Sequence, residues 1–466
     1  MSGLRRDSRW LFAAYGSGNL SLAAYYVISS SFMLFATSIL GLPPWVAGLL
    51  MAASTVWDAL TDMPMGWLSD ASRSVRFGRR HGYLLVGAVA VAVSSIWLWS
   101  LRPDGPLWWT ATQLGLAVFA VKTALTVFVV PYIALADELG ENEHARGQLH
   151  AWRGMFQFLS IVVTAVGGNL IFFRATEAYP RGQLNPDAYA PMGWALAVLV
   201  LLAGGFSAWT TRHARHALLP KHGRAFLPQL SEIWRSHNAR RLFGMILCIE
   251  TTFQIGIALG SHVYTYTYQV GAHFIALFGI AVLLPAALGQ FLWAFVADRV
   301  GKKAALFWAA GFALSGAVLG PVLHVGLGVF PLEPDRLAYS LTPFLMLQGL
   351  GAGAFSSLPF RMIGDCARAS VPAGEAAPEG TWIGFYTLGY KLGGSISLML
   401  AGVILQQIGF DAAQPTQASS VRDALAMAPA LLLLLIAPLA AWLLAGYREG
   451  GRDGIHFSGE PHGARR

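Results

Sequence analysis

The sequence of 466 residues has little charge and almost no cysteine. Charged residues make up 12% of it and the mean hydropathy is +0.53, whereas a soluble domain carries about twice that share of charge. The scarcity of charge excludes a soluble globular protein and indicates an integral membrane protein with many spans. The two cysteines, Cys248 and Cys366, suggest no disulfide framework, and we expect both to be small apolar packing residues.

Recognisable catalytic sets are also missing. We find no serine–histidine–acid arrangement, phosphate-binding loop or zinc-ligand spacing, and the 12 histidines lie mostly in loops and in the C-terminal tail. We therefore expect neither an enzyme nor a bound cofactor. The net charge of +8 does not require a nucleic-acid partner, because basic cytoplasmic loops account for it in a membrane protein. The expected partners are the lipid bilayer and a small-molecule substrate, and we expect a monomer.

Long apolar runs dominate what is present. They are continuous, unlike the short alternating segments of an outer-membrane barrel, and lipid allows only helices or closed barrels to span it. Each run is long enough to cross a hydrocarbon core of about 30 Å. The twelve expected spans are residues 10–40, 45–69, 83–101, 107–136, 148–173, 192–211, 242–268, 273–297, 304–330, 338–364, 381–409 and 422–446.

The lysines and arginines predict an orientation. If both termini are cytoplasmic, 24 of the 32 lie in cytoplasmic segments and five on the opposite side. Lys122, Arg153 and Lys391 remain inside spans. This asymmetry predicts a multi-pass protein of the cytoplasmic membrane with both termini in the cytoplasm.

The two halves of the chain repeat a short motif. A glycine or alanine is followed four residues later by aspartate and then by a basic pair, each time after the second span of a half. The copies contain Gly66, Asp70, Arg79 and Arg80 in the first half, and Ala294, Asp298, Arg299, Lys302 and Lys303 in the second. Six plus six helices in parallel repeat predict an all-α membrane protein with the major facilitator fold. The expected parts are an N-terminal bundle (1–211), a basic cytoplasmic linker (212–241), a C-terminal bundle (242–446) and a disordered cytoplasmic tail (447–466).

Asp58 and Asp62 lie inside the second apolar run, four residues apart. On a helix both carboxylates share one face, and ionisable groups within a span are functional by default. The pair could form a cation or proton site, or it could be buried polar residues that fix helix packing. Because two unpaired negative charges repel strongly in a low dielectric, we expect a positive partner or a bound proton. Lys122 is the candidate partner, so we expect H⁺ coupling rather than Na⁺ coupling.

Several motifs together resemble the glycoside–pentoside–hexuronide cation symporter family. They are Asp58-x-x-x-Asp62, Phe77-Gly78-Arg79-Arg80, Tyr15-Gly16-x-Gly18, Pro131-Tyr132, Pro359-x-x-Met362-x-x-Asp365 and Lys391-Leu392-Gly393. The resemblance implies solute entry coupled to Na⁺, Li⁺ or H⁺, with Asp58, Thr61, Asp62 and Thr126 as the cation site and no other metal site. It also implies that Arg153 and Lys391 lie near the cavity.

Some positions depart from that family. Its sugar-binding carboxylates fall at Ala23 and Val129, and an aromatic that would stack on a sugar falls near Ile133. Because carboxylates bind sugar hydroxyls by charge-assisted hydrogen bonds, a lysophospholipid, another amphiphile or an organic anion is an alternative to a glycoside. A non-transporting receptor or assembly factor is a third hypothesis, disfavoured because the span-two carboxylates are intact.

Other polar residues within the spans are candidates for the substrate cavity. They are Asn19, Tyr26, Lys122, Arg153, Glu250 and Lys391. Structural alternatives stay open: an ion pair for either lysine, a gate salt bridge for Arg153, and pairing with lysine, proton relay or backbone packing for Glu250. Gly66, Asp70, Arg79, Arg80, Asp298, Arg299 and Asp365 are expected at cytoplasmic loops, where they would control gating.

Overall fold

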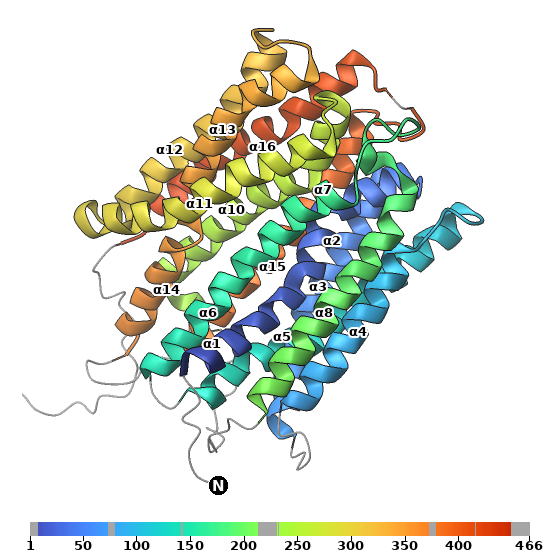
Figure 1. Cartoon of the computed structure of the whole chain (residues 1–466). Coiled ribbons are helices and arrows are strands. Elements are labelled where there is room, and N and C mark those ends of the chain that lie inside the picture. The colour runs from blue at the N-terminus through green and yellow to red at the C-terminus, as the bar shows by residue number, and fades with distance from the viewer. Residues whose placement is uncertain are drawn as a thin grey trace, which may run out of the picture.

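The computed structural model describes residues 8–72, 80–140, 143–212, 231, 233–371, 379–414 and 416–448. Within these ranges every regular element is a helix or a helical turn (Figure 1). The first half contains α1 (Ser8–Ser17), α2 (Ala23–Leu34), α3 (Pro44–Ala71), α4 (His81–Trp99), α5 (Leu107–Leu139), α6 (Glu143–Val162), α7 (Gly168–Ile171) and α8 (Tyr189–Thr211). The second half contains α10 (His237–His262), α11 (Ala272–Val300), α12 (Lys302–Pro321), α13 (Pro334–Phe355), α14 (Leu358–Ala369), α15 (Glu379–Gln407) and α16 (Ser419–Ala445).

Ten helical segments of the described chain are long and apolar enough to cross a membrane. This agrees with the predicted multi-pass protein. α3 and α13 are not among the ten, so the count of twelve spans remains a prediction.

The helices run between two ends of the molecule. At one end, called here the terminal face, the Asn238 amide donates to the Arg448 carbonyl (2.9 Å) and the Lys303 ammonium to the Tyr447 carbonyl (3.2 Å). The starts of α10 and α12 and the end of α16 therefore meet there, and α1 begins on the same side (Figure 1). The other end is called the distal face.

Some of the predicted spans are interrupted. The tenth consists of α13 and α14, which are separated at Ser356 and Ser357 because Pro359 lies in the first turn of α14 and cannot continue the preceding helix. In the first span a 3₁₀ turn, Gly18–Leu22, joins α1 to α2. A Cβ at Gly18 would lie 2.7 Å from the Tyr132 ring, so glycine permits this close contact between α5 and the first span.

The halves close against each other towards the distal face. Ser261 donates to the Ser30 carbonyl (2.7 Å), Tyr266 donates to Ser38 (2.9 Å), and Thr37 is hydrogen-bonded to His262 (2.9 Å). One buried apolar cluster joins residues of both halves, including Phe35 and Phe410, whereas a second, from Ile233 to Tyr447, contains second-half residues alone. The structure is therefore closed at the distal face.

Small residues let α3 and α15 approach each other on that side. A Cβ at Gly402 would lie 2.4 Å from the Pro44 carbonyl oxygen and 3.0 Å from the Cα of Gly48. Ser395 donates to the Ala52 carbonyl (3.0 Å) one step nearer the centre. Close helix contact through small residues is typical of membrane bundles, and here it places the middle of α15 against the middle of α3.

Candidate functional site

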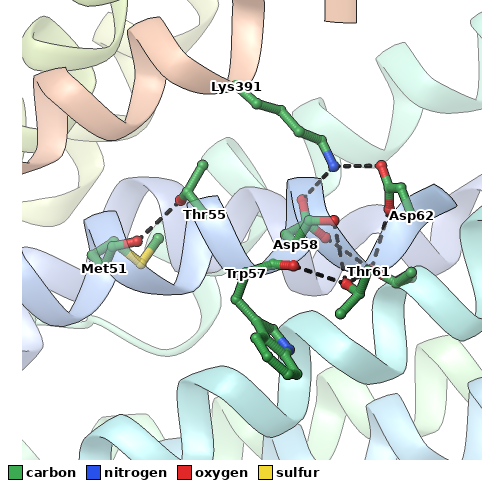
Figure 2. Close-up of polar contacts among 8 residues, drawn as sticks. Met51, Thr55, Trp57, Asp58, Thr61, Asp62 and Lys391 are labelled. Carbon is green, nitrogen blue, oxygen red and sulfur yellow. Dashed lines mark hydrogen bonds and ion pairs between the residues drawn. The ribbon is translucent and has the colours of Figure 1, made fainter. Parts of the chain in front are cut away.

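The middle of α3 presents two carboxylates to one ammonium from the other half of the molecule. The Lys391 Nζ of α15 lies 2.8 Å from Asp58 Oδ2 and 2.5 Å from Asp62 Oδ2. Figure 2 shows the lysine reaching across to both side chains. The four-residue spacing on α3 points both carboxylates the same way, so one cation contacts both. This ion-paired triad links the two halves.

Thr126 of α5 completes the polar cluster. Its hydroxyl lies within hydrogen-bonding distance of Asp58 Oδ1 (3.0 Å) and Asp62 Oδ1 (3.3 Å). Thr61 lies 3.5 Å from Thr126 and donates to the Trp57 carbonyl (3.0 Å). The four residues expected at the cation site, Asp58, Thr61, Asp62 and Thr126, are thus brought together, with oxygen atoms that suit a hard cation.

The triad has an unbalanced charge. Two carboxylates and one ammonium sum to −1 when all three are ionised. The side chains of Asp58 and Lys391 are each 16% exposed and that of Asp62 is 34% exposed. This partial burial strengthens the ion pairs relative to a fully exposed pair, and one further monovalent cation would neutralise the cluster.

Lys122 does not form the ion pair expected from the sequence. It is 2% exposed, and its ammonium lies 4.8 Å from the ring centroid of Tyr25. Among the described residues, the ammonium paired with Asp58 and Asp62 comes from Lys391 instead. The sequence could not reveal that Lys391 takes the place expected for Lys122. The contact between α3 and α15 joins the two halves of the molecule and depends on how the halves pack.

The other candidate cavity residues lie apart from the triad contacts. Glu250 of α10 is 9% exposed, and its Oε2 has no hydrogen-bond partner within the described residues. Asn19 is buried in the 3₁₀ turn, and its amide nitrogen has no such partner either. Arg153 of α6 and Tyr26 of α2 are half-buried, and they interact electrostatically.

Tyr390 of α15, near the centre of the molecule, was not predicted from the sequence to lie near the cavity. A side-chain hydrogen bond joins Tyr25 of α2 to Tyr390 of α15, and Gln254 of α10 donates to the Tyr390 hydroxyl at 3.5 Å. The position of Tyr390 directly before Lys391 could have suggested a place near the cavity. The interaction between the halves could not be read from the sequence.

The second signature loop forms ion pairs at the terminal face. Asp298, near the end of α11, pairs with Arg361 of α14 (2.5 Å). Asp365 pairs with Lys302 of α12 and with Arg368 (2.7 Å). These bridges tie the ends of α11, α12 and α14 together. The Arg299 guanidinium lies over the Phe295 ring, 3.3 Å from its centroid.

The first signature loop is described in part. Gly66 lies within α3, with Val130 Cγ1 3.7 Å from the position that a Cβ would take. Arg80 pairs with Glu138 at the end of α5 (3.2 Å), and both side chains are nearly buried. The side chain of Asp70 and all of Arg79 lie outside the described residues.

The chain is similar to known transporters over most of its length. It is 23% identical to an inner membrane symporter of Escherichia coli over 92% of this chain and 88% of the relative. It is 22% identical to the sodium-dependent lysophosphatidylcholine symporter 1 of Xenopus tropicalis over 86% of this chain and 80% of the relative. Among solved structures, a D-xylose–proton symporter superposes with a TM-score of 0.58 at 16% identity, covering 91% of this chain and 96% of that one.

These similarities agree with the repeated motifs and with the helical architecture. The model of the MFS/sugar transport protein family matches residues 13–448, which include the triad and both signature loops. The chain belongs to this family and is a multi-pass membrane transporter of small molecules, not an enzyme.

Proposed function

We propose that the protein is a secondary active symporter that couples entry of a small organic solute to a cation bound at Asp58 and Asp62. The observation that carries the proposal is the lysine that reaches both carboxylates from the opposite half. Any ligand that competes with Lys391 for these carboxylates changes a contact between the halves. The triad can therefore couple cation binding to the motion that alternates access.

Lys391 has a definite role in this scheme. After the cation leaves, two carboxylates remain in a partly buried site, where leaving them unpaired would be costly. The lysine compensates one of the two charges and allows the empty carrier to change conformation. An arriving cation compensates the other charge and weakens the hold of Lys391 on α3, which allows the halves to separate.

The orientation follows from the distribution of basic residues. The start of α1, the end of α16 and the ion pairs of Asp298 and Asp365 lie at the terminal face, and the loops expected on this side of the sequence carry the excess of lysine and arginine, which supports a cytoplasmic terminal face under the positive-inside rule. Both termini then lie on the cytoplasmic side of a bacterial-type cytoplasmic membrane. Because the distal face is closed, this conformation faces inward, the state from which solute and cation are released.

H⁺ is our proposed coupling ion, with Na⁺ as the alternative. An ammonium already lies between the two carboxylates, and one proton would bring the net charge of the triad from −1 to zero without displacing it. Na⁺ would instead require several oxygen ligands. Asp58, Asp62 and Thr126 supply three such side chains, with Thr61 in a position to join them.

We propose that the protein acts as a monomer with two helical bundles, residues 1–211 and 242–446. Membership of the family favours a glycoside-like compound as the transported solute. The similarity to a lysophosphatidylcholine symporter supports an amphiphile or organic anion as the second candidate. The absence of carboxylates at Ala23 and Val129 supports the same alternative, since these would bind sugar hydroxyls.

The test has two stages. Sugars, organic anions and lysolipids are first screened for thermal stabilisation of the purified protein, since a ligand that binds the folded state raises its apparent stability. Uptake of each hit into proteoliposomes is then measured under an imposed pH gradient and under an imposed Na⁺ gradient. Accumulation in either case supports symport, and accumulation driven by the pH gradient identifies H⁺. Equilibration without accumulation under both gradients would refute the proposal.

A further inference from the structure

Three arginines gather at the terminal face where α10 begins and α16 ends, and they are called here the arginine cluster. Arg240 and Arg241 lie near the start of α10, and Arg448 follows the end of α16. The Asn238 amide fixes Arg448 beside α10, because it donates to the Arg448 carbonyl (2.9 Å) and accepts from the Arg448 N–H (3.0 Å). Arg240 and Arg448 are exposed, and Arg241 is half-buried.

The arginine cluster lacks the carboxylate partners that other basic residues of this face have. Lys302 and Arg368 pair with Asp365, and Arg361 pairs with Asp298. Within the described ranges, no member of the cluster forms a salt bridge. Three neighbouring guanidinium groups repel one another, so an anion bound among them would be strongly favoured.

Arg241 is held in a defined position. Its guanidinium lies over the Trp442 ring of α16, 4.0 Å from the centroid. A Cβ at Gly446 would lie 2.7 Å from the Arg241 Cζ, so glycine allows the guanidinium to pack against the end of α16. Nη1 makes one long hydrogen bond to the Trp442 carbonyl (3.5 Å), and Nε and Nη2 have no acceptor among the described residues.

The ring beneath Arg241 belongs to a lipid-facing surface. Trp442 is 60% exposed, and Leu431, Leu435 and Leu439 of the same helix are exposed as well. A spacing of three or four residues places all four side chains on one face of α16. This apolar face is called here the α16 stripe. Tryptophan is enriched where a span meets the headgroup region, so Arg241 lies at the depth of lipid phosphates.

The chemistry of the site selects a phospholipid with a net negative charge. A guanidinium binds phosphate oxygens through two parallel hydrogen bonds, and the positive end of the α10 dipole favours an anion at the same place. Basic pockets between spans on the cytoplasmic side bind anionic headgroups. The α16 stripe offers a surface for acyl chains, which a soluble anion would leave unused.

We infer that the arginine cluster binds the headgroup of an anionic phospholipid, with its phosphate on Arg241 and an acyl chain along the α16 stripe. The site lies outside the cavity between the halves and does not depend on the solute or on the coupling ion. Because the lipid would contact both α10 and α16, its binding should stabilise the folded protein.

The experiment titrates lipids into the purified, delipidated full-length protein in detergent. Phosphatidylglycerol is compared with phosphatidylcholine of the same acyl chains, in which choline cancels the charge of the phosphate. Glycerophosphoglycerol supplies the anionic headgroup without chains. Affinity is measured from thermal stabilisation as a function of lipid concentration, and native mass spectrometry counts the lipids bound to each protein.

We expect phosphatidylglycerol to bind about tenfold or more tightly than phosphatidylcholine, the effect of one charge-assisted contact. Arg241→Gln should weaken phosphatidylglycerol binding about fivefold or more, the contribution of one arginine near an anionic surface. It should leave phosphatidylcholine binding unchanged. Glycerophosphoglycerol at the same concentration should not stabilise the protein.

The matched control is Arg299→Gln. Arg299 also lies at the terminal face, with its guanidinium over an exposed ring, that of Phe295 (3.3 Å to the centroid). It is in the last turn of α11, where the helix dipole disfavours an anion, so this variant should bind phosphatidylglycerol as the wild type does. If Arg241→Gln fails to fold, Arg448→Gln decides the question, because Arg448 is exposed.

Three results would each overturn the inference. The first is equal affinity for phosphatidylglycerol and phosphatidylcholine. The second is an equal loss of phosphatidylglycerol binding in Arg241→Gln and Arg299→Gln, which would show a general attraction to surface charge. The third is stabilisation by glycerophosphoglycerol as strong as that by the lipid, which would show a site for soluble anions.

Discussion

Replacement of Lys391 by methionine tests the ion-paired triad in its simplest form. The side chain becomes one heavy atom shorter and loses its charge, so Thr126 is the hydrogen-bond partner that Asp58 and Asp62 keep among the described residues. Removing one member of a buried ion pair costs about 3–5 kcal/mol, because the other charge stays unpaired. Asp62 is 34% exposed and Asp58 is 16% exposed, so solvent screening reduces the expected loss to about 1–3 kcal/mol.

The loss of stability caused by Lys391→Met should depend on pH and should be reduced by a second substitution. Lowering the pH protonates one of two adjacent carboxylates, so Lys391→Met should approach wild-type stability as the pH falls. Asp62→Asn, introduced into Lys391→Met, removes one of the two repelling charges and should recover most of the loss. Thermal unfolding in one detergent across a pH series measures both effects.

An exposed ion pair provides the control for this experiment. Arg336 and Glu333 lie 3.0 Å apart and are 73% and 69% exposed, so Arg336→Met should cost about 0.5 kcal/mol or less. The reasoning would be wrong if Lys391→Met matched the wild type at neutral pH. It would equally be wrong if adding Asp62→Asn lowered stability further.

Three more predictions follow from the closed distal face, from the signature loops and from topology. Gly402→Val would place a side chain against Pro44 and should shift the population of conformations towards the outward-open state. A cysteine introduced at Ser38 should then be labelled more readily from outside the cell, and unchanged labelling would contradict the assigned conformation. Asp298→Asn removes the pair with Arg361 and should slow transport severalfold while the unfolding temperature changes little; an unaltered rate would reduce the motif to a structural marker. A cysteine placed in the 212–241 linker should resist membrane-impermeant reagents in intact cells, and ready labelling would invert the topology.

The sequence was sufficient to predict the general architecture and one side of the central site. Long apolar runs and the repeated loop indicated the fold, and the four-residue spacing of Asp58 and Asp62 placed both carboxylates on one helix face. Thr126 came from the family resemblance. The fold is confirmed and the structure brings Asp58, Asp62 and Thr126 together, because these expectations depend on local periodicity or on motifs that lie within one half; the role of the three residues at a cation site stays a prediction.

Features that depend on the packing of helices from different segments were missed. Lys122 and Lys391 both appeared as mid-span lysines, and the sequence alone did not indicate which would reach α3. The close packing of α15 on α3, through Gly48 and Gly402, places Lys391 beside the carboxylates of α3. The break between α13 and α14 was also missed, although Pro359 offered a local signal that the apolar run around it obscured.

The most direct test of the central claim compares accumulation with exchange for Asp62→Asn. Both are measured in proteoliposomes with the same solute, one under an imposed cation gradient and the other with solute on both sides and no gradient. We predict that the variant loses accumulation and retains exchange, because the solute site stays intact while the coupling carboxylate is gone. Accumulation at the wild-type level by Asp62→Asn would show that the pair on α3 is structural and would contradict the account.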